Sequence, residues 1–248
     1  MFFDTTATFL AKLQIKQCLQ SLKFVLYFAV ARHPERSLFN RAFEFFSNDL
    51  LPSEESFYIS QKHPPIILIN MAVNIINGKE CETLNSQYAQ RVSEAGAIPM
   101  LIPSIEKPAI IETLLDQADG VLFIGGKDYL PSSYGCQPHP ETFLGRLRPD
   151  FDITFARAAL QRTMPILGIC GGCQLINIVT GGKLIQHLDN AEDHCGGKFH
   201  TAQITASGSF AEALQLAVND ELTLNSYHHQ AVDPDNLGRN IKSNLHRL

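Results

Sequence analysis

The 248-residue sequence contains no tryptophan, has few charged residues and carries no basic excess. Charged side chains make up 18% and hydrophobic ones 45% of the chain, a balance typical of a globular protein with a large core. The formal net charge of −5 argues against a nucleic-acid partner, because proteins that bind nucleic acid usually carry a basic stripe. The missing tryptophan limits aromatic anchoring without deciding the function.

Long apolar runs are also scarce, and this bears on membranes and secretion. The run Phe24–Ala31 is too short to span a bilayer, and Lys23 and Arg32 flank it. A secretory signal would place its basic residues before the apolar run and a small-residue cleavage site after it, and neither pattern is convincing here. We therefore expect no membrane partner.

The first sixty residues differ from the rest in being rich in phenylalanine. Phe39, Phe43 and Phe46 fall at positions i, i+4 and i+7, which predicts a helix that ends near Pro52. We predict a helical extension over residues 1–60 and a main domain over residues 61–248. The extension either packs on the main domain or serves as an arm for a protein partner or self-association, because aromatic patches often mark interaction sites.

The main domain centres on a short apolar run that leads into a cysteine. Pro165–Ile169 is short and rich in branched residues, which predicts a buried strand. Cys170 and a glycine pair follow, and then Leu175, Ile176 and Val179 recur at helical spacing. This stretch predicts a strand, a tight turn and a helix, with a cysteine at the turn.

The spacing Gly168-x-Cys170-x-Gly172 is the cysteine counterpart of the G-x-S-x-G nucleophile elbow. Side chains at the two glycine positions would collide in so sharp a turn. We expect the N-terminus of the following helix to favour the thiolate over the thiol, and the N–H of Gly171 to face an oxyanion. Cys170 is thus a candidate nucleophile, and the alternative is a buried, inert cysteine.

Strands and helices alternate through the rest of the main domain. The expected strands are 65–70, 98–103, 120–124 and 222–225, with 184–188 as a strand or turn. The expected helices are 85–95, 109–118, 150–161 and 210–216. The 98–103 strand has proline near its start and at its end, which suits the edge of a sheet. Alternation of this kind predicts a parallel, doubly wound sheet.

Two further segments carry candidate site residues. Gly125 and Gly126 follow the 120–124 strand, and a glycine pair lets backbone N–H groups approach a ligand closely. The alternative for this pair is a plain turn. His228 and His229 lie together in an apolar flank, which suits the lining of a pocket, although one histidine could instead be structural and the other exposed.

Four segments, in this order, resemble class I glutamine amidotransferase-like proteins, most closely the γ-glutamyl-γ-aminobutyrate hydrolase branch. They are EAGAIPMLIPS, GVLFIGGKDYLPSSYG, GICGGCQLINIVTGGKLIQHL and LNSYHHQAVD. The resemblance runs from about Pro64 to the end of the sequence. Four ordered motifs are far more specific than one short pattern.

The resemblance implies a flavodoxin-like α/β fold with helices on both faces of the sheet. It implies a cysteine hydrolase that cleaves γ-glutamyl amides through a thioester, with Cys170 as nucleophile and Gly171 and Gly126 donating to the oxyanion. It also implies an acidic residue on the 150–161 helix that faces the site, either Asp150 or Asp152, although solvated charges at a helix start are the alternative. The implied substrate-binding positions are Gly125, Asp128, Gln174, Tyr227, His228, His229 and Gln230.

The sequence departs from this resemblance in the general base. The family carries a histidine and a glutamate two residues apart, several tens of residues after the double-histidine motif. This sequence ends at Leu248, and His246 has no glutamate two positions on. Three interpretations follow: the protein is inactive, it uses His228 or His229 instead, or another chain completes the site. Gly171 and Lys127 also depart, because relatives often have a large residue at the first position and a small one at the second.

Two other functions compete with the hydrolase. The first is a catalytically silent member that acts as a binding or interaction protein through the phenylalanine-rich extension. The second treats Cys170 and Cys173 as a redox pair or as metal ligands, joined by His194, Cys195 or His200. The hydrolase remains the leading hypothesis, with no cofactor and no metal. Six cysteines in a chain this long do not make a disulfide scaffold, and a catalytic thiol needs to stay reduced, so we expect a cytoplasmic protein.

Overall fold

The structure is a computed structural model that describes residues 64–143, 148–162, 164–207, 211, 216–243 and 245–247. The predicted helical extension over residues 1–60 lies outside the described residues, as does most of the helix expected at 210–216. In the described part of the chain, no helix is long and apolar enough to cross a membrane.

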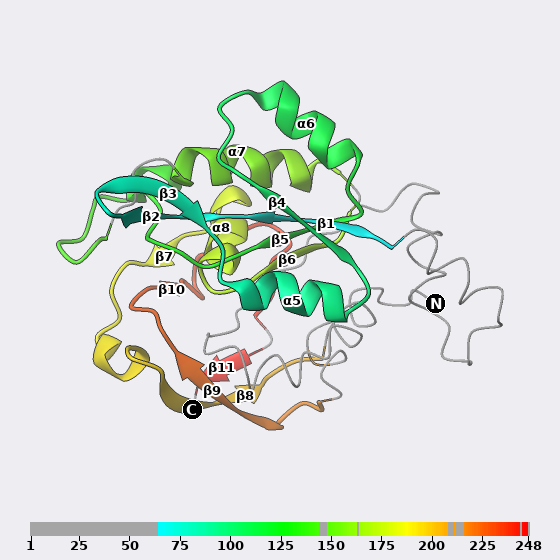
Figure 1. Ribbon diagram of the computed structural model, residues 1–248. Coiled ribbons are helices and arrows are strands. Elements are labelled where there is room, and N and C mark those ends of the chain that lie inside the picture. The colour runs from blue at the N-terminus through cyan, green and yellow to red at the C-terminus, as the bar shows by residue number, and fades with distance from the viewer. Residues whose placement is uncertain are drawn as a thin grey trace, which may run out of the picture.

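A four-stranded parallel sheet forms the centre of the molecule (Figure 1). Its strands run in the order β4 (Ile98–Ile102), β1 (Ile66–Asn70), β5 (Gly120–Phe123) and β6 (Ile166–Gly168). β4 is an edge strand, so the proline at position 99 removes no hydrogen bond that a central strand would need. The four strands predicted around this sheet are confirmed.

Helices cover both faces of the sheet, as predicted. They are α5 (Ser86–Glu94), α6 (Pro108–Asp116), α7 (Arg148–Leu160) and α8 (Gly171–Val179). Leu68, Phe123 and Ile166 pack into one core cluster with residues of α6, α7 and α8. Ile67 and Ile69 pack into a second cluster with residues of α5. Because both faces are buried, the strands are continuously apolar instead of alternating, which is usual for parallel sheets. The flavodoxin-like α/β fold is therefore confirmed.

A hairpin between β1 and α5 was not predicted. Its strands, β2 (Ala72–Ile76) and β3 (Lys79–Thr83), pair antiparallel across a turn at Asn77 and Gly78. Both turn residues have positive φ, 52° and 76°. An Asn-Gly pair adopts this conformation readily, and it is the strongest short signal for a hairpin in a sequence.

The C-terminal part of the described chain forms two small antiparallel sheets. One has the order β11 (Leu245–Arg247), β8 (Lys198–Ile204) and β9 (Glu221–Ser226). The other pairs β7 (Leu184–Ile185) with β10 (Ala231–Val232). Two short 3-10 helices, η1 (Pro131–Tyr134) and η2 (Ala191–His194), lie in the connections. The strands expected near 184–188 and at 222–225 are confirmed, whereas β8 was not predicted.

Candidate active site

Cys170 lies at the turn between β6 and α8, in a strained backbone conformation. Its φ is 53° and its ψ is −113°, and it is the N-cap of α8. A residue other than glycine held in such a region costs on the order of 1–3 kcal/mol, and strain of this kind clusters at functional sites. A sharp strand-to-helix turn with a strained central residue is the geometry of a nucleophile elbow. The predicted strand, turn and helix are therefore confirmed.

The two glycines that flank the turn are required by close backbone packing. A Cβ on Gly168 would lie 2.6 Å from the carbonyl carbon and oxygen of Gly172. A Cβ on Gly172 would lie 2.2 Å from the carbonyl oxygen of Phe123 in β5. Backbone atoms cannot move aside as a flexible side chain can. The predicted steric reason for the Gly-x-Cys-x-Gly spacing is thus confirmed.

The loop after β5 lies directly against the elbow. A Cβ on Gly125 would lie 3.6 Å from Cys170 Sγ, and a Cβ on Gly171 would lie 3.2 Å from the backbone nitrogen of Gly126. The structure therefore brings Cys170, Gly171, Gly125 and Gly126 together at the carboxyl edge of the parallel sheet. In open α/β sheets this edge is where ligands bind.

A buried arginine on α7 holds the loop. Arg148 Nη1 donates to the carbonyl oxygen of Gly125 at 2.7 Å, and Nη2 donates to the carbonyl oxygen of Ile124, also at 2.7 Å. The Nε of Arg148 donates to Asp152 Oδ2 at 2.7 Å. Arg148 was not predicted from the sequence, although its spacing of four residues from Asp152 on a helix is a recognisable ion-pair pattern.

Asp152 is completely buried and accepts three hydrogen bonds from side chains. Besides Arg148, Tyr129 Oη donates to its Oδ2 at 2.9 Å and Asn70 Nδ2 donates to its Oδ1 at 2.8 Å. Burial raises the pKa of Asp152, while these three donors favour its charged form and oppose the rise. Of the two acidic residues considered on this helix, Asp150 is exposed, and Asp152 points inward to Arg148.

The surroundings of the Cys170 thiol act on its pKa in opposite directions. Burial raises the pKa of the Cys170 thiol, and the nearby Asp128 adds to the rise. The N–H of Gly171 and the charge of Arg148 lower the pKa but do not outweigh burial. The helix start does favour the thiolate, through the N–H of Gly171, but the desolvation of the thiol outweighs this effect.

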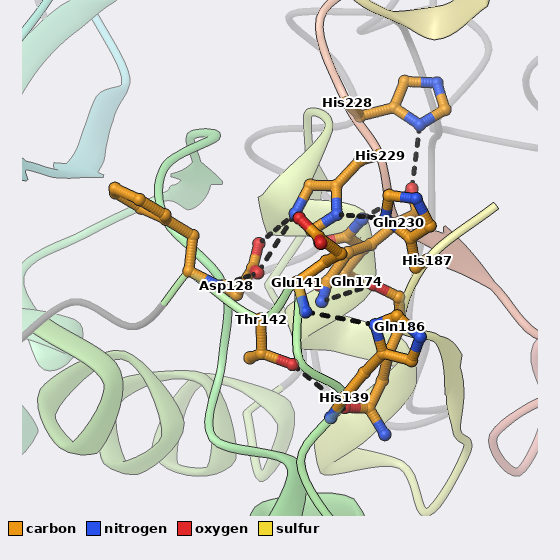
Figure 2. A network of polar contacts seen from close by, with 11 residues as sticks. Asp128, His139, Glu141, Thr142, Gln174, Gln186, His187, His228, His229 and Gln230 are labelled. Atoms are coloured by element: carbon orange, nitrogen blue, oxygen red, sulfur yellow. Dashed lines mark hydrogen bonds and ion pairs between the residues drawn. The ribbon is translucent and has the colours of Figure 1, made fainter. Parts of the chain in front are cut away.

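The double-histidine segment, residues 227–230, places the rings of His228 and His229 in different surroundings (Figure 2). His229 Nε2 lies 3.1 Å from Asp128 Oδ2, and His229 Nδ1 lies 3.3 Å from His187 Nδ1. The His187 ring in turn stacks on His139, with 5.4 Å between ring centroids. Asp128 thus joins the loop that carries Gly125 and Gly126 (the glycine loop) to the imidazole rings of His229, His187 and His139.

His228 is buried on the other side of the segment. Its Nδ1 lies 2.8 Å from the carbonyl oxygen of Gln230, and its ring centroid lies 4.7 Å from that of His194. Burial, and secondarily His194, lower the pKa of His228 from 6.5 to about 4. The unfolded chain therefore binds more protons than the folded one between these values, so folding stability is lost as the pH falls from about 6.5 to about 4.

The remaining predicted binding residues lie around this segment. Gln174 in α8 donates from Nε2 to the carbonyl oxygen of Gln230 at 3.2 Å, and Gln230 Nε2 donates to the carbonyl oxygen of Gln186. Tyr227 is partly exposed, and its hydroxyl would lie 2.5 Å from a Cβ on Gly197. Gln174 and Gln230 thus join α8 to the double-histidine segment.

The hydrogen bonds described above for His228 and His229 run to Gln230, Asp128 and His187, and none of them involves Cys170 Sγ. The described residues also contain no group of three or more His, Cys, Asp or Glu side chains that could hold a metal ion. Cys170 and Cys173 are both free thiols. The arrangement therefore places a free thiol beside the backbone of Gly171 and Gly126, and the described cysteines and histidines form no group that could hold a metal ion.

Comparison with known proteins identifies the family. Residues 65–243 match the Peptidase C26 family. The chain is 35% identical over 158 residues to the Mycobacterium tuberculosis protein named "Putative glutamine amidotransferase Rv2859c", covering 60% of this chain and 50% of that protein. It is 29% identical over 170 residues to protein NtpR of Enterococcus hirae, covering 65% of this chain and 70% of NtpR.

A third relative carries an enzymatic name. The chain is 29% identical over 188 residues to γ-glutamyl-γ-aminobutyrate hydrolase PuuD of Escherichia coli strain K12, covering 67% of this chain and 70% of PuuD. The chain thus spans half the length of the mycobacterial relative and 70% of the other two. The family match spans most of the chain and the motifs lie in the elbow, the glycine loop and the double-histidine segment. The chain therefore belongs to the Peptidase C26 family of class I glutamine amidotransferase-like proteins.

Proposed function

We propose that this protein is a cysteine hydrolase that cleaves γ-glutamyl amide bonds through a thioester on Cys170. The observation that carries the proposal is the contact between the strained Cys170 turn and the glycine loop, where the backbone of Gly126 lies beside that of Gly171. Membership of the Peptidase C26 family and the similarity to a γ-glutamyl-γ-aminobutyrate hydrolase support the same reaction class.

In the proposed reaction, Cys170 Sγ attacks the γ-carbonyl carbon of the substrate. A carbon–sulfur bond forms, and the carbonyl oxygen becomes an oxyanion that accepts hydrogen bonds from the N–H groups of Gly171 and Gly126. The carbon–nitrogen bond then breaks, and the amine leaves with the proton that the thiol gave up. In the second half of the reaction, water attacks the thioester carbon, a carbon–oxygen bond forms and the carbon–sulfur bond breaks. The γ-carboxyl group is released, and one proton of the water returns to the sulfur of Cys170. One well-placed backbone donor to an oxyanion contributes on the order of 3 kcal/mol to lowering such a barrier.

Both halves of the reaction need a proton acceptor. Because burial raises the pKa of Cys170, the thiol must lose its proton to a base as it attacks. Of the two histidines considered as the base, His228 and His229, it is His229 that a carboxylate orients, since its Nε2 faces Asp128. In the structure His229 contacts Asp128 and His187, so a role as base requires its imidazole to turn toward the sulfur.

We also propose that the glycine loop and the double-histidine segment contact the substrate. A γ-glutamyl group carries an α-ammonium and an α-carboxylate, so its recognition needs one anionic and several donor groups. Asp128 supplies a carboxylate, and Gln174, Tyr227, His228, His229 and Gln230, with the backbone of Gly125, supply polar groups. A catalytic thiol of this kind fits a reducing compartment.

Release of glutamate from γ-glutamyl-γ-aminobutyrate and from related γ-glutamyl amides tests the proposal. We expect release by the wild-type protein, loss of release in Cys170→Ala, and unchanged release in Cys195→Ala, because Cys195 is an exposed free cysteine outside the strand–turn–helix that carries Cys170. Equal release by wild type and Cys170→Ala would exclude Cys170 as the nucleophile. No release by the wild-type protein would favour the binding-protein alternative.

A further inference from the structure

The strongest unassigned feature is the buried network of Arg148 and Asp152 behind the glycine loop. We propose that Arg148, oriented by Asp152, is a positioning residue that fixes the Gly125–Gly126 peptide so that the Gly126 N–H is available to an oxyanion beside Cys170. The inference rests on the proposed function for its chemical meaning. The orientation of the Gly125–Gly126 peptide itself follows from the contacts of Arg148.

The orientation follows from two hydrogen bonds and the planarity of the peptide. Arg148 Nη1 holds the carbonyl oxygen of Gly125 at 2.7 Å. The described chain contains no cis peptide bond, so the N–H of Gly126 points in the direction opposite to that carbonyl. The Gly126 N–H therefore points away from the guanidinium, while its nitrogen lies against the Gly171 side of the elbow.

The same arginine also holds the peptide between Ile124 and Gly125. The carbonyl oxygen of Ile124 accepts from Arg148 Nη2 at 2.7 Å, and the N–H of Ile124 donates to Asn70 Oδ1 at 2.8 Å. Asn70 also donates to Asp152, so one buried network holds both the N–H and the carbonyl of Ile124. A glycine pair has wide conformational freedom, so without these bonds the Gly125–Gly126 peptide could rotate and turn its carbonyl toward the sulfur.

The identity of each residue fits this role. A planar guanidinium can donate to two carbonyls and a carboxylate at once, whereas a lysine offers one compact ammonium and cannot match that fork. Asp152 is fully buried, so its carboxylate fixes the fork and balances a cation that is 7% exposed. Gly126 is required for a matching reason: a Cβ there would lie 1.8 Å from Arg148 Nη1, and its φ does not fall in the left-handed region.

The experiment compares Arg148→Met and Arg148→Lys with Arg162→Met. Arg162 is a matched control because it is a partly exposed arginine just beyond α7 that pairs with Glu112 and Asp116 and donates to the carbonyl oxygen of Ala158. The first readout is acylation by a γ-glutamyl p-nitroanilide, which forms an oxyanion. The second is alkylation of Cys170 by iodoacetamide, which forms none. The third is the amide signal of Gly126 in ¹⁵N-labelled protein, assigned in the wild type by triple-resonance spectra.

We expect both Arg148 variants to lose roughly 10²- to 10³-fold in acylation rate, the effect of removing one oxyanion donor, with little change in KM. Alkylation should change by less than about threefold in Arg148→Lys, because no oxyanion forms and the lysine keeps the positive charge that lowers the pKa of Cys170. The Gly126 amide signal should move in Arg148→Lys and stay in place in Arg162→Met. If Arg148→Met does not fold, Arg148→Lys decides the matter by the same readouts.

The outcomes separate the two proposals. A folded Arg148 variant that acylates as fast as wild type, or that keeps the Gly126 signal in place, would overturn the positioning role. Equal losses in acylation and alkylation by Arg148→Lys, which keeps the charge, would also overturn it, because they indicate a general distortion of the turn. Absence of acylation in the wild-type protein would contradict the proposed function, and the Gly126 signal would then still decide the positioning role.

Discussion

Replacement of Asp152 by asparagine should destabilise this protein far more than the loss of an ordinary ion pair. Asp152 is 0% exposed and accepts hydrogen bonds from Arg148, Tyr129 and Asn70. Asp152→Asn keeps the volume but removes the charge, so the buried guanidinium of Arg148 loses its counter-ion. Breaking one partner of a buried pair typically costs about 3–5 kcal/mol, against a total stability of about 5–15 kcal/mol for a domain.

The matched control is Asp116→Asn. Asp116 Oδ1 also lies 2.7 Å from an arginine, Nη2 of Arg162, but its side chain is 71% exposed. An exposed pair contributes about 0–1 kcal/mol. Urea unfolding at neutral pH measures both, and with a slope near 3 kcal/mol per molar, Asp152→Asn should lower the midpoint by about 1 M or more. Midpoints for Asp152→Asn and Asp116→Asn that agree within error would refute the reasoning, because burial would then have no effect.

Three further expectations concern protonation and packing. The pKa of His228 falls from 6.5 to about 4 on folding, so wild-type stability should drop by about 3 kcal/mol between pH 7 and pH 4, and His228→Leu should remove that part of the slope; an identical pH profile in the variant would contradict the assignment. Gly172→Ala places a Cβ 2.2 Å from the carbonyl oxygen of Phe123 and should cost about 1–3 kcal/mol by urea unfolding, whereas a neutral result would show that the turn can relax. Iodoacetamide at neutral pH should alkylate the exposed Cys195 before Cys170, whose pKa burial raises, and peptide mapping that finds the reverse order would mean that Cys170 is ionised.

The sequence predicted the central fold because its strongest patterns are local. The continuous apolar runs that end in Asn70, in Ile124 and in Cys170 mark strands buried on both faces, and they are the strands of the parallel sheet. The β2–β3 hairpin was missed although Asn77 and Gly78 signal it, because its strands are short and partly polar. β8 was missed because Lys198, His200 and Gln203 interrupt its apolar residues and because its pairing with β9 depends on contacts distant in sequence.

The site was predictable where backbone geometry sets the residue type. The steric need for glycine at 168 and 172 can be inferred from a turn motif, and the structure gives the same reason. Arg148 was not predictable in this way, because its partners Ile124 and Gly125 lie more than twenty residues away and use only backbone carbonyls. The raised pKa of Cys170 was missed for a similar reason: burial depends on the whole fold, whereas a helix start is visible in the sequence.

The central claim is that Cys170 carries the acyl group in a γ-glutamyl transfer. Brief incubation with a γ-glutamyl p-nitroanilide, acid quenching and peptide mass mapping measure this directly, because a thioester adds one glutamyl group to the peptide that contains the acylated cysteine. The account predicts that the adduct lies on Cys170, is absent in Cys170→Ala and is lost on treatment with hydroxylamine, which cleaves thioesters. An adduct on Cys173 or Cys195, or no adduct while glutamate is released, would contradict the account.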